Sequence, residues 1–386
     1  MESGAATRPG PGTGRPASYR EVTGLGRVRR VALVASIVAL IPAVFSYVGA
    51  ISRPSNSPVG IRTVEWLRDH GAAGIVAKVE SIYYSLTAPP KGGATLKALP
   101  NVGNGAVAGA RAASEYRPAR VHAIIHPALP GEGVWHATRV GLEAEPPVLL
   151  TTLRNQPEYP RVVAGLAWIN TKRTTLTYNP GRLEPSVTLP RGTMDVPHKD
   201  RPRLLATFNS GFKLADSAGG VVDGGHTYAP MRNGIGTIVG YTDGHVDVVY
   251  WNYGSTAPAN VSFARQNLPL IVQEGKPNPN IANDAEWGAT VGNAVLVWRS
   301  SIGVDKHGNL IYVAGEDQSV TSLAKTLIRA GAVRAMELDI NSFWTSFISY
   351  GAAGGEDPKN LLAGMNRPAT RYLEPDDRDF FAIYSK

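Results

Sequence analysis

Three polar side chains at alternate positions, Glu337, Asp339 and Asn341, have the types and spacing that suggest chemistry. Because successive side chains of a strand point to opposite faces, all three would share one face of a strand that ends there. Apolar residues flank them, and carboxylates are costly to bury without partners. This pattern predicts an acid–base or ligand-binding site. A solvated strand end or a structural hydrogen-bond cluster is the alternative interpretation.

The segments before this cluster indicate how a sheet would hold it. A strand leads into Arg299, a hairpin returns as a second strand, and an amphipathic helix then precedes the strand of the carboxylates. The helix ends at Gly331, since glycine commonly terminates helices. In chain order these elements are predicted at 294–298, 306–309 (the turn), 310–313, 319–330 and 333–338. They indicate a mixed sheet with a helix crossing over it.

The chain beyond about residue 118 is rich in short strands and poor in helices. Apolar runs bounded by turns that contain Gly and Pro are typical of such strands. Further strands are predicted at 120–126, 148–153, 161–169, 174–178, 204–208, 235–239, 246–251 and 268–272. We therefore predict the α+β class, with a mixed β-sheet core and flanking helices, preceded by one transmembrane helix.

Composition narrows the possible chemistry. The chain of 386 residues contains no cysteine, which excludes disulfides, thiolate metal sites and a cysteine nucleophile. Its net charge is +8, but the Lys and Arg residues are scattered, so we expect no nucleic-acid partner. We expect no cofactor and no metal. A divalent ion on Glu337, Asp339 and Asn341 stays open, because oxygen ligands scattered through a fold leave no readable spacing.

The N-terminal region has the pattern of a membrane anchor. The run 31–51 carries no charge and is long enough to cross the hydrocarbon core as a helix. Arginines before it, such as Arg29 and Arg30, predict a single-pass protein of the cell membrane, with its N-terminus cytoplasmic and its C-terminal domain extracytoplasmic. A cleaved signal peptide ending near Ala50 is the alternative.

Four regions are expected along the chain. Residues 1–30 form a cytoplasmic disordered tail, 31–51 the transmembrane anchor, 52–117 a helical stalk and flexible linker, and 118–386 the extracytoplasmic domain. Apolar residues between 62 and 86 recur every three or four positions, which predicts one or two amphipathic helices with a break near Gly71. These helices either pack on the domain, which we favour, or lie on the membrane surface.

From about residue 203 to 350, the order of motifs resembles the phosphodiester glycosidase family, the domain of the enzyme that uncovers mannose 6-phosphate by removing N-acetylglucosamine. The motifs that carry this likeness are Asn209-Ser210-Gly211-Phe212, Arg299-Ser300-Ser301-Ile302-Gly303, Leu323-Ala324 and Leu338-Asp339. The membrane-anchored layout is similar to actinobacterial members of the group. After the Leu-Asp pair the family has a Gly-rich turn and Ser, whereas this chain has Ile340-Asn341-Ser342.

The resemblance implies a glycosidase-like hydrolase that acts on a sugar phosphodiester or a related envelope glycan. Asp339 and Glu337 would then supply the acid and the base or nucleophile, since glycoside hydrolysis usually needs two carboxylates. Arg299 would clamp the phosphate, because its fork of N–H donors suits phosphate oxygens. An ion pair of Arg299 with Glu337 or Asp339 is the structural alternative.

Four further residues are predicted to bind the substrate. Asn209 and Asn341 would orient its hydroxyls, Gly211 lies in the same turn as Asn209, and His226 would donate a proton. The rival function is a non-catalytic cell-surface module that binds a glycan in the same cleft. In that case the altered loop after Asp339 would have lost catalysis.

Overall fold

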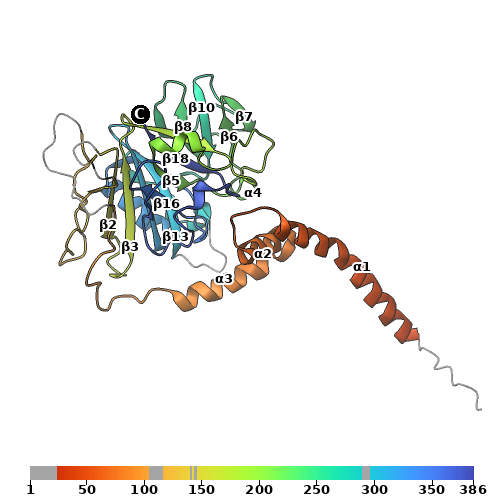
Figure 1. Ribbon diagram of the computed structural model, residues 1–386. Coiled ribbons are helices and arrows are strands. Elements are labelled where there is room, and N and C mark those ends of the chain that lie inside the picture. The colour runs from red at the N-terminus through yellow and green to blue at the C-terminus, as the bar shows by residue number, and fades with distance from the viewer. Residues whose placement is uncertain (1–23, 104–115, 140, 143–145, 289–295) are drawn as a thin grey trace, which may run out of the picture. The chain divides into compact units, whose positions relative to one another are not determined.

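The structure is a computed structural model, and it describes residues 24–103, 116–139, 141–142, 146–288 and 296–386 (Figure 1). The predicted disordered tail, up to residue 23, and the start of the strand predicted at 294–298 lie outside these described residues. The chain forms two compact units, Met1–Arg53 and Pro54–Lys386.

The first unit contains one long apolar helix, α1 (Gly24–Ser52), with Pro42 inside it. Its segment Gly26–Ser52 has 27 residues, and the most apolar 18-residue window in it has a mean hydropathy of 2.4 with none of that window buried. At about 1.5 Å per residue this segment extends beyond the roughly 30 Å hydrocarbon core of a bilayer. It is long and apolar enough to cross a membrane, and a signal sequence near the N-terminus has the same properties.

The second unit begins with a helical hairpin that consists of α2 (Val59–Leu67), the turn η1 (Arg68–Ala72) and α3 (Ala73–Thr87). Inside the turn, Gly71 has φ +86°, a conformation that glycine adopts without steric cost. The predicted pair of helices with a break near Gly71 is therefore confirmed.

Among the described residues, most of the rest of the unit is built from three antiparallel sheets (Figure 1). In spatial order, the largest contains β1 (His136–Ala137), β2 (Val148–Arg154), β3 (Val163–Ile169), β14 (Leu310–Gln318), β13 (Val297–Asp305), β15 (Ala332–Glu337), β11 (Leu270–Gln273) and β12 (Lys276–Pro277). The second contains β7 (His226–Ala229), β6 (Val221–Asp223), β10 (Val261–Gln266), β8 (Gly236–Tyr241) and β9 (Val246–Tyr250).

The third sheet contains β17 (Pro358–Asn360), β16 (Phe347–Tyr350), β5 (Leu204–Asn209), β18 (Phe380–Ser385) and β4 (Thr174–Asn179). Apolar side chains from all three sheets meet in one hydrophobic core, where Phe208, Ile238 and Ile302 are fully buried. Short helices in the connections are η2 (His198–Arg203), α4 (Leu214–Ser217), η3 (Asp284–Trp287) and η4 (Arg371–Leu373).

Helix α5 (Val320–Arg329) covers the other face of the largest sheet, with Leu323 and Leu327 fully buried against it. Ser319 caps the helix by accepting a hydrogen bond from the Ser322 backbone N–H, as in a capping box. Strands β14 and β15 lie on either side of β13 and are both antiparallel to it. The predicted helical crossover is confirmed, and it joins two strands that run in the same direction.

The predicted α+β class is confirmed, together with the apolar helix near the N-terminus. The strand predicted at 120–126 is wrong, because this segment has no partner strand. There the Val121 side chain is buried, and the Val121 N–H bonds to the Gly133 carbonyl at 3.0 Å. The apolar alternation in 120–126 therefore reflects an irregular segment with a buried Val121 side chain, not a strand.

Candidate active site

Contrary to the prediction from the sequence, Glu337, Asp339 and Asn341 do not lie on one continuous strand face. Strand β15 stops at Glu337, so Asp339 and Asn341 lie in the loop that follows it. The backbone of this loop is held by Ser300 on β13, whose N–H donates to the Asp339 carbonyl at 2.9 Å. The two carboxylates therefore have different surroundings, although they are only two positions apart.

Asp339 is the carboxylate that faces a cavity, although only 4% of its surface is exposed. Its Oδ1 accepts a hydrogen bond from the Asn341 N–H at 2.9 Å, and its Oδ2 accepts one from Arg378 Nη2 at 3.1 Å. Burial raises the pKa of Asp339, and the charge of Arg378 only partly opposes this effect. A carboxyl whose pKa is raised by burial is suited to proton transfer.

Arg378 precedes β18 and reaches the loop after β15 from the C-terminal end of the chain. Besides Asp339, its guanidinium donates to the Gly211 carbonyl at 3.0 Å and lies 5.0 Å from the centre of the Trp344 ring. The planar fork is thus held by three different contacts in a buried position. Such a fixed guanidinium is a ready ligand for an oxyanion.

Glu337 lies deeper and pairs with Arg299 on the neighbouring strand β13, with Oε1 and Nη1 2.7 Å apart. Arg299 is 0% exposed and also donates to the carbonyls of Trp287 and Gln318. Burial raises the pKa of Glu337 to about 7, despite the lowering effect of Arg299. Its Oε2 has no hydrogen-bond partner among the described residues.

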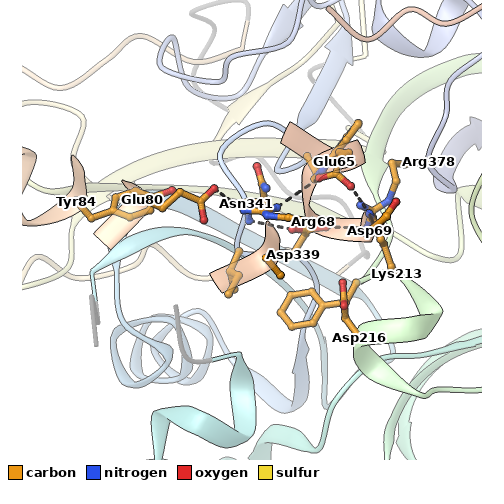
Figure 2. A pocket seen from close by; sticks show the side chains of 14 residues that line it. Glu65, Arg68, Asp69, Glu80, Tyr84, Lys213, Asp216, Asp339, Asn341 and Arg378 are labelled. Atoms are coloured by element: carbon orange, nitrogen blue, oxygen red, sulfur yellow. Dashed lines mark hydrogen bonds and ion pairs between the residues drawn. The ribbon is translucent and has the colours of Figure 1, made fainter. Parts of the chain in front are cut away.

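The cavity beside Asp339 has a volume of about 390 Å³. One wall comes from the helical hairpin, and the other from the loops after β5 and β15 and from Arg378 (Figure 2). The hairpin contributes Glu65, Arg68, Asp69, Ala73, Glu80 and Tyr84. The remaining lining residues are Phe212, Lys213, Asp216, Asp339, Ile340, Asn341, Trp344 and Arg378.

Ion pairs connect the two walls of the cavity. Lys213 pairs with Glu65 and, at 3.4 Å, with Asp69, both on the hairpin. Within the hairpin, Arg68 pairs with Glu80 and lies 3.4 Å from Glu65 (Figure 2). Burial raises the pKa of Glu65, but the charge of Lys213 outweighs this effect and leaves that pKa below its ordinary value. The hairpin is thus held over the cavity by charge.

Two of the predicted substrate-binding residues lie in the framework below the loop. Asn209 is buried at the end of β5, where its Nδ2 donates to Ser300 Oγ at 3.0 Å and its Oδ1 accepts from the Tyr312 hydroxyl at 2.9 Å. At Gly211 an added Cβ would lie 2.8 Å from the Asn267 side chain, so only glycine fits. Gly211 is connected to the cavity indirectly, because its carbonyl accepts a hydrogen bond from Arg378.

His226 is separate from this cluster. It lies on β7 in the second sheet, its side chain is exposed, and its Nδ1 is 3.0 Å from the Gly224 carbonyl. It does not line the cavity, and neither do Asn209, Glu337 and Arg299. Of the seven residues proposed from the sequence, the structure brings Asp339 and Asn341 to the cavity wall.

Two of the cationic residues in the cavity, Lys213 and Arg378, are not among the site residues predicted from the sequence. Lys213 directly follows the Asn209–Phe212 turn, which was a signal for it. Arg378 stands in the charged run 376–379, immediately before the apolar strand β18, and charges so close to a core strand suggest buried partners. Within the described residues, no group of three or more His, Asp or Glu side chains is arranged to hold a metal ion.

A match to a known protein family supports a glycosidase-like hydrolase domain in the second half of the chain. Residues 203–339 match the family model described as phosphodiester glycosidase, which confirms the resemblance drawn from the motifs. Comparison with curated proteins finds no match.

Three solved structures resemble this chain at low sequence identity. The first is the zebrafish N-acetylglucosamine-1-phosphodiester alpha-N-acetylglucosaminidase catalytic domain, auto-inhibited by its pro-peptide (15% identity, 65% of this chain, 87% of that chain, TM-score 0.42). A hypothetical Synechocystis protein has 14% identity over 62% of each chain, with a TM-score of 0.38. An exported Burkholderia pseudomallei protein has 11% identity over 60% of this chain and 75% of that chain, with a TM-score of 0.37.

Proposed function

We propose that the protein is a membrane-anchored, extracytoplasmic hydrolase that cleaves the glycosidic bond of a sugar phosphodiester or a related envelope glycan. The observation that carries this proposal is the pair of Asp339 and Arg378, 3.1 Å apart in the wall of a polar cavity. Asp339 also closes the segment matched by the phosphodiester glycosidase family. A carboxyl beside a fixed guanidinium supplies both a proton-transfer group and an anion ligand.

Asp339 contacts the substrate in this proposal and, when protonated, donates its proton to the glycosidic oxygen as the bond between that oxygen and the sugar carbon breaks. A water molecule supplies the hydroxyl group that replaces the leaving group on the sugar. We assign the contact with the phosphate to Arg378, because its side chain lines the cavity, whereas Arg299 is fully buried. Lys213, on the same wall, adds a second positive charge.

Glu337 is the second carboxylate of the proposed mechanism, and Arg299 holds it in place. With a pKa of about 7, Glu337 populates both its protonated and its ionised form near neutral pH, as a general acid–base group must. Glu337 is 0% exposed and does not line the cavity, so in this proposal it acts without direct contact with the substrate. Asn341 remains a proposed sugar contact, and Trp344, which lines the same cavity wall, is proposed as a second one.

A glycan-binding module without catalysis is the second candidate. Ile340 lines the cavity at the position where the family has a Gly-rich turn, and an isoleucine side chain takes space that glycine leaves to a ligand. Both candidate functions use the same cavity, so they are distinguished by whether the protein cleaves the bound substrate.

Turnover of two chromogenic substrates tests the proposal: a sugar phosphodiester and the plain glycoside of the same sugar. We expect the full chain in detergent to cleave the phosphodiester preferentially, and Arg378→Lys to lose this preference because a lysine cannot offer two parallel N–H bonds. Arg203→Lys, at an arginine whose side chain is 53% exposed, is the matched control.

Equal cleavage of both substrates would keep the glycosidase and remove the phosphate role of Arg378. Saturable binding of the phosphodiester without any cleavage, by protein with a cooperative thermal transition, would instead support the binding module.

A further inference from the structure

The outer face of helix α3 carries an apolar stripe that is exposed along its whole length. The side chains of Ile75, Val79, Ile82, Tyr83 and Leu86 are exposed to 71, 62, 54, 62 and 81%, respectively. At about 100° per residue these positions fall within roughly 100° of the helix circumference. One continuous stripe of large apolar side chains is therefore exposed on the second unit.

The other side of the same helix faces the domain. Val76 is buried, and Ala73, Glu80 and Tyr84 line the cavity beside Asp339. Tyr84 also lies near Ser342 in the loop that follows Asp339. The stripe is thus the rear surface of a cavity wall, and whatever covers the stripe lies next to the cavity.

The chain just before the hairpin is fixed to the domain close to the end of the apolar helix α1. Ser55 donates to Asp377, and the Asn56 Nδ2 donates to Asp376 at 3.0 Å and to the Arg371 carbonyl at 3.1 Å. Helix α1 ends at Ser52, three residues before Ser55, and three residues extend for only about 10 Å. If α1 crosses a membrane, as proposed above, this part of the domain is held at the bilayer surface.

We propose that the apolar stripe of α3 lies in the interfacial layer of the bilayer that α1 crosses. This inference rests on the membrane anchor of the proposed function. The stripe contains no charged side chain, Tyr83 has the apolar body and polar tip typical of membrane interfaces, and Lys78 is exposed at its edge. Because the connection to α1 is short, the bilayer that α1 crosses is the apolar environment within reach of the stripe.

This placement also specifies the class of substrate. The hairpin separates the stripe from the cavity by the width of one helix, so the cavity opens beside the membrane. A substrate that stays in the bilayer through a lipid chain would present its sugar phosphodiester there. The proposed substrate is therefore an amphiphilic sugar phosphodiester with its apolar part in the membrane.

Because the chain contains no cysteine, single labelled cysteines report on the stripe directly. Val79→Cys and Leu86→Cys carry an environment-sensitive fluorophore in the full chain, reconstituted in phosphatidylcholine–phosphatidylglycerol vesicles with nitroxide-labelled lipids. Asp243→Cys, in the β8–β9 turn of the second sheet, is the control. We expect lipid nitroxides to quench the labels at 79 and 86 at least threefold more strongly than the label at 243.

Equal quenching at all three positions would overturn the proposal. It would also be overturned if the labels at 79 and 86 were shielded only at high protein density, with cross-links between copies, because the partner would then be a second copy of the chain.

The substrate class has its own measurement. We expect Val79→Ser combined with Leu86→Ser to lower turnover of a long-chain lipid sugar phosphodiester in vesicles about tenfold, while turnover of its short-chain soluble analogue stays within twofold. Equal loss on both substrates would overturn the role of the stripe in presenting the substrate. The quenching experiment needs no turnover, so failure of the proposed hydrolase, seen as no cleavage of either substrate by wild type, is distinguishable from failure of the membrane contact.

Discussion

Asp339 and Glu337 are two carboxylates only two positions apart, but the fold gives them different surroundings and therefore different chemical properties. Asp339 lies in a loop, lines a cavity and meets Arg378, a residue far along the chain. Glu337 ends a central strand and meets Arg299 across the strand pair. The first carboxyl is accessible to a ligand, while the second is shielded and has its pKa raised to about 7.

We expect Asp339→Asn to lower kcat/KM by about 10²–10⁴, the contribution typical of a general acid or base. Asparagine has the same shape and keeps an oxygen for the Asn341 N–H, so the loop should keep its conformation. The thermal midpoint is the control: a fall in activity that only follows unfolding would contradict a catalytic role. Turnover like that of wild type would remove Asp339 from the mechanism.

Glu337 predicts a specific dependence of stability on pH. Its pKa is about 7 in the folded protein and about 4.5 in the unfolded chain. Between these values the folded state binds more protons, so stability falls as pH rises from about 4.5 to 7, by on the order of a few kcal/mol, and is then constant. We expect Glu337→Gln to remove this slope, although it leaves Arg299 unpaired and lowers stability overall.

Thermal midpoints of wild type and Glu337→Gln between pH 4.5 and 8 measure the difference in slope. Parallel curves for the two proteins would show that Glu337 is ionised throughout this range.

At the scale of elements, the helical hairpin is the cavity wall most easily released. Its charged contacts with the domain pass through Lys213, which pairs with Glu65 and Asp69. We expect Lys213→Met to loosen residues 59–87, because removal of the lysine leaves the Glu65 carboxylate without its main counter-charge. Hydrogen exchange of this segment should rise at least tenfold, while exchange in β13 and β14 stays unchanged.

Lys199→Met, at an exposed lysine in η2, is the matched control for this experiment. Unchanged exchange in the hairpin of Lys213→Met would mean that apolar packing, such as that of Val76, holds the hairpin in place.

The elements themselves were largely predictable, because local patterns determine them. Continuous apolar runs predicted β2, β3, β5 and β14, and glycine spacing predicted the hairpin break. The end of β15 was not predictable in this way, because alternation continues through Asn341 although the strand stops at Glu337.

The candidate site was predictable only where motif order helped. Asp339 emerged from local alternation and from the family motif, but its partner Arg378 follows it by 39 residues and arrives through the third sheet. The sequence suggests that Arg378 has a buried partner, but it does not identify Asp339 as that partner. Similarly, Arg299 has the residue type of an anion clamp, and only its full burial beside Glu337 reveals a different environment.

At the scale of the whole molecule, the hydrophobic clusters all belong to the second unit and begin at Val121. The unit Pro54–Lys386 therefore contains its own core, and stability should not depend on α1. We expect a chain cut before Pro54 to keep the thermal midpoint of the full chain within about 3 °C. A loss of cooperative unfolding on removal of residues 1–53 would contradict this independence.

The same division makes the role of the N-terminal helix testable. An uncleaved anchor predicts that the protein stays in the membrane fraction after an alkaline carbonate wash, with an intact mass that includes residues 1–53. A cleaved signal peptide predicts release and a mature N-terminus near Ile51. Release would detach the domain from the bilayer, and the stripe of α3 would then have to bind lipid without an anchor. A few kcal/mol of interfacial burial would hold such a protein only weakly and reversibly. Retention with the full mass is the outcome we expect, because the apolar segment is long enough to remain in the membrane as a spanning helix.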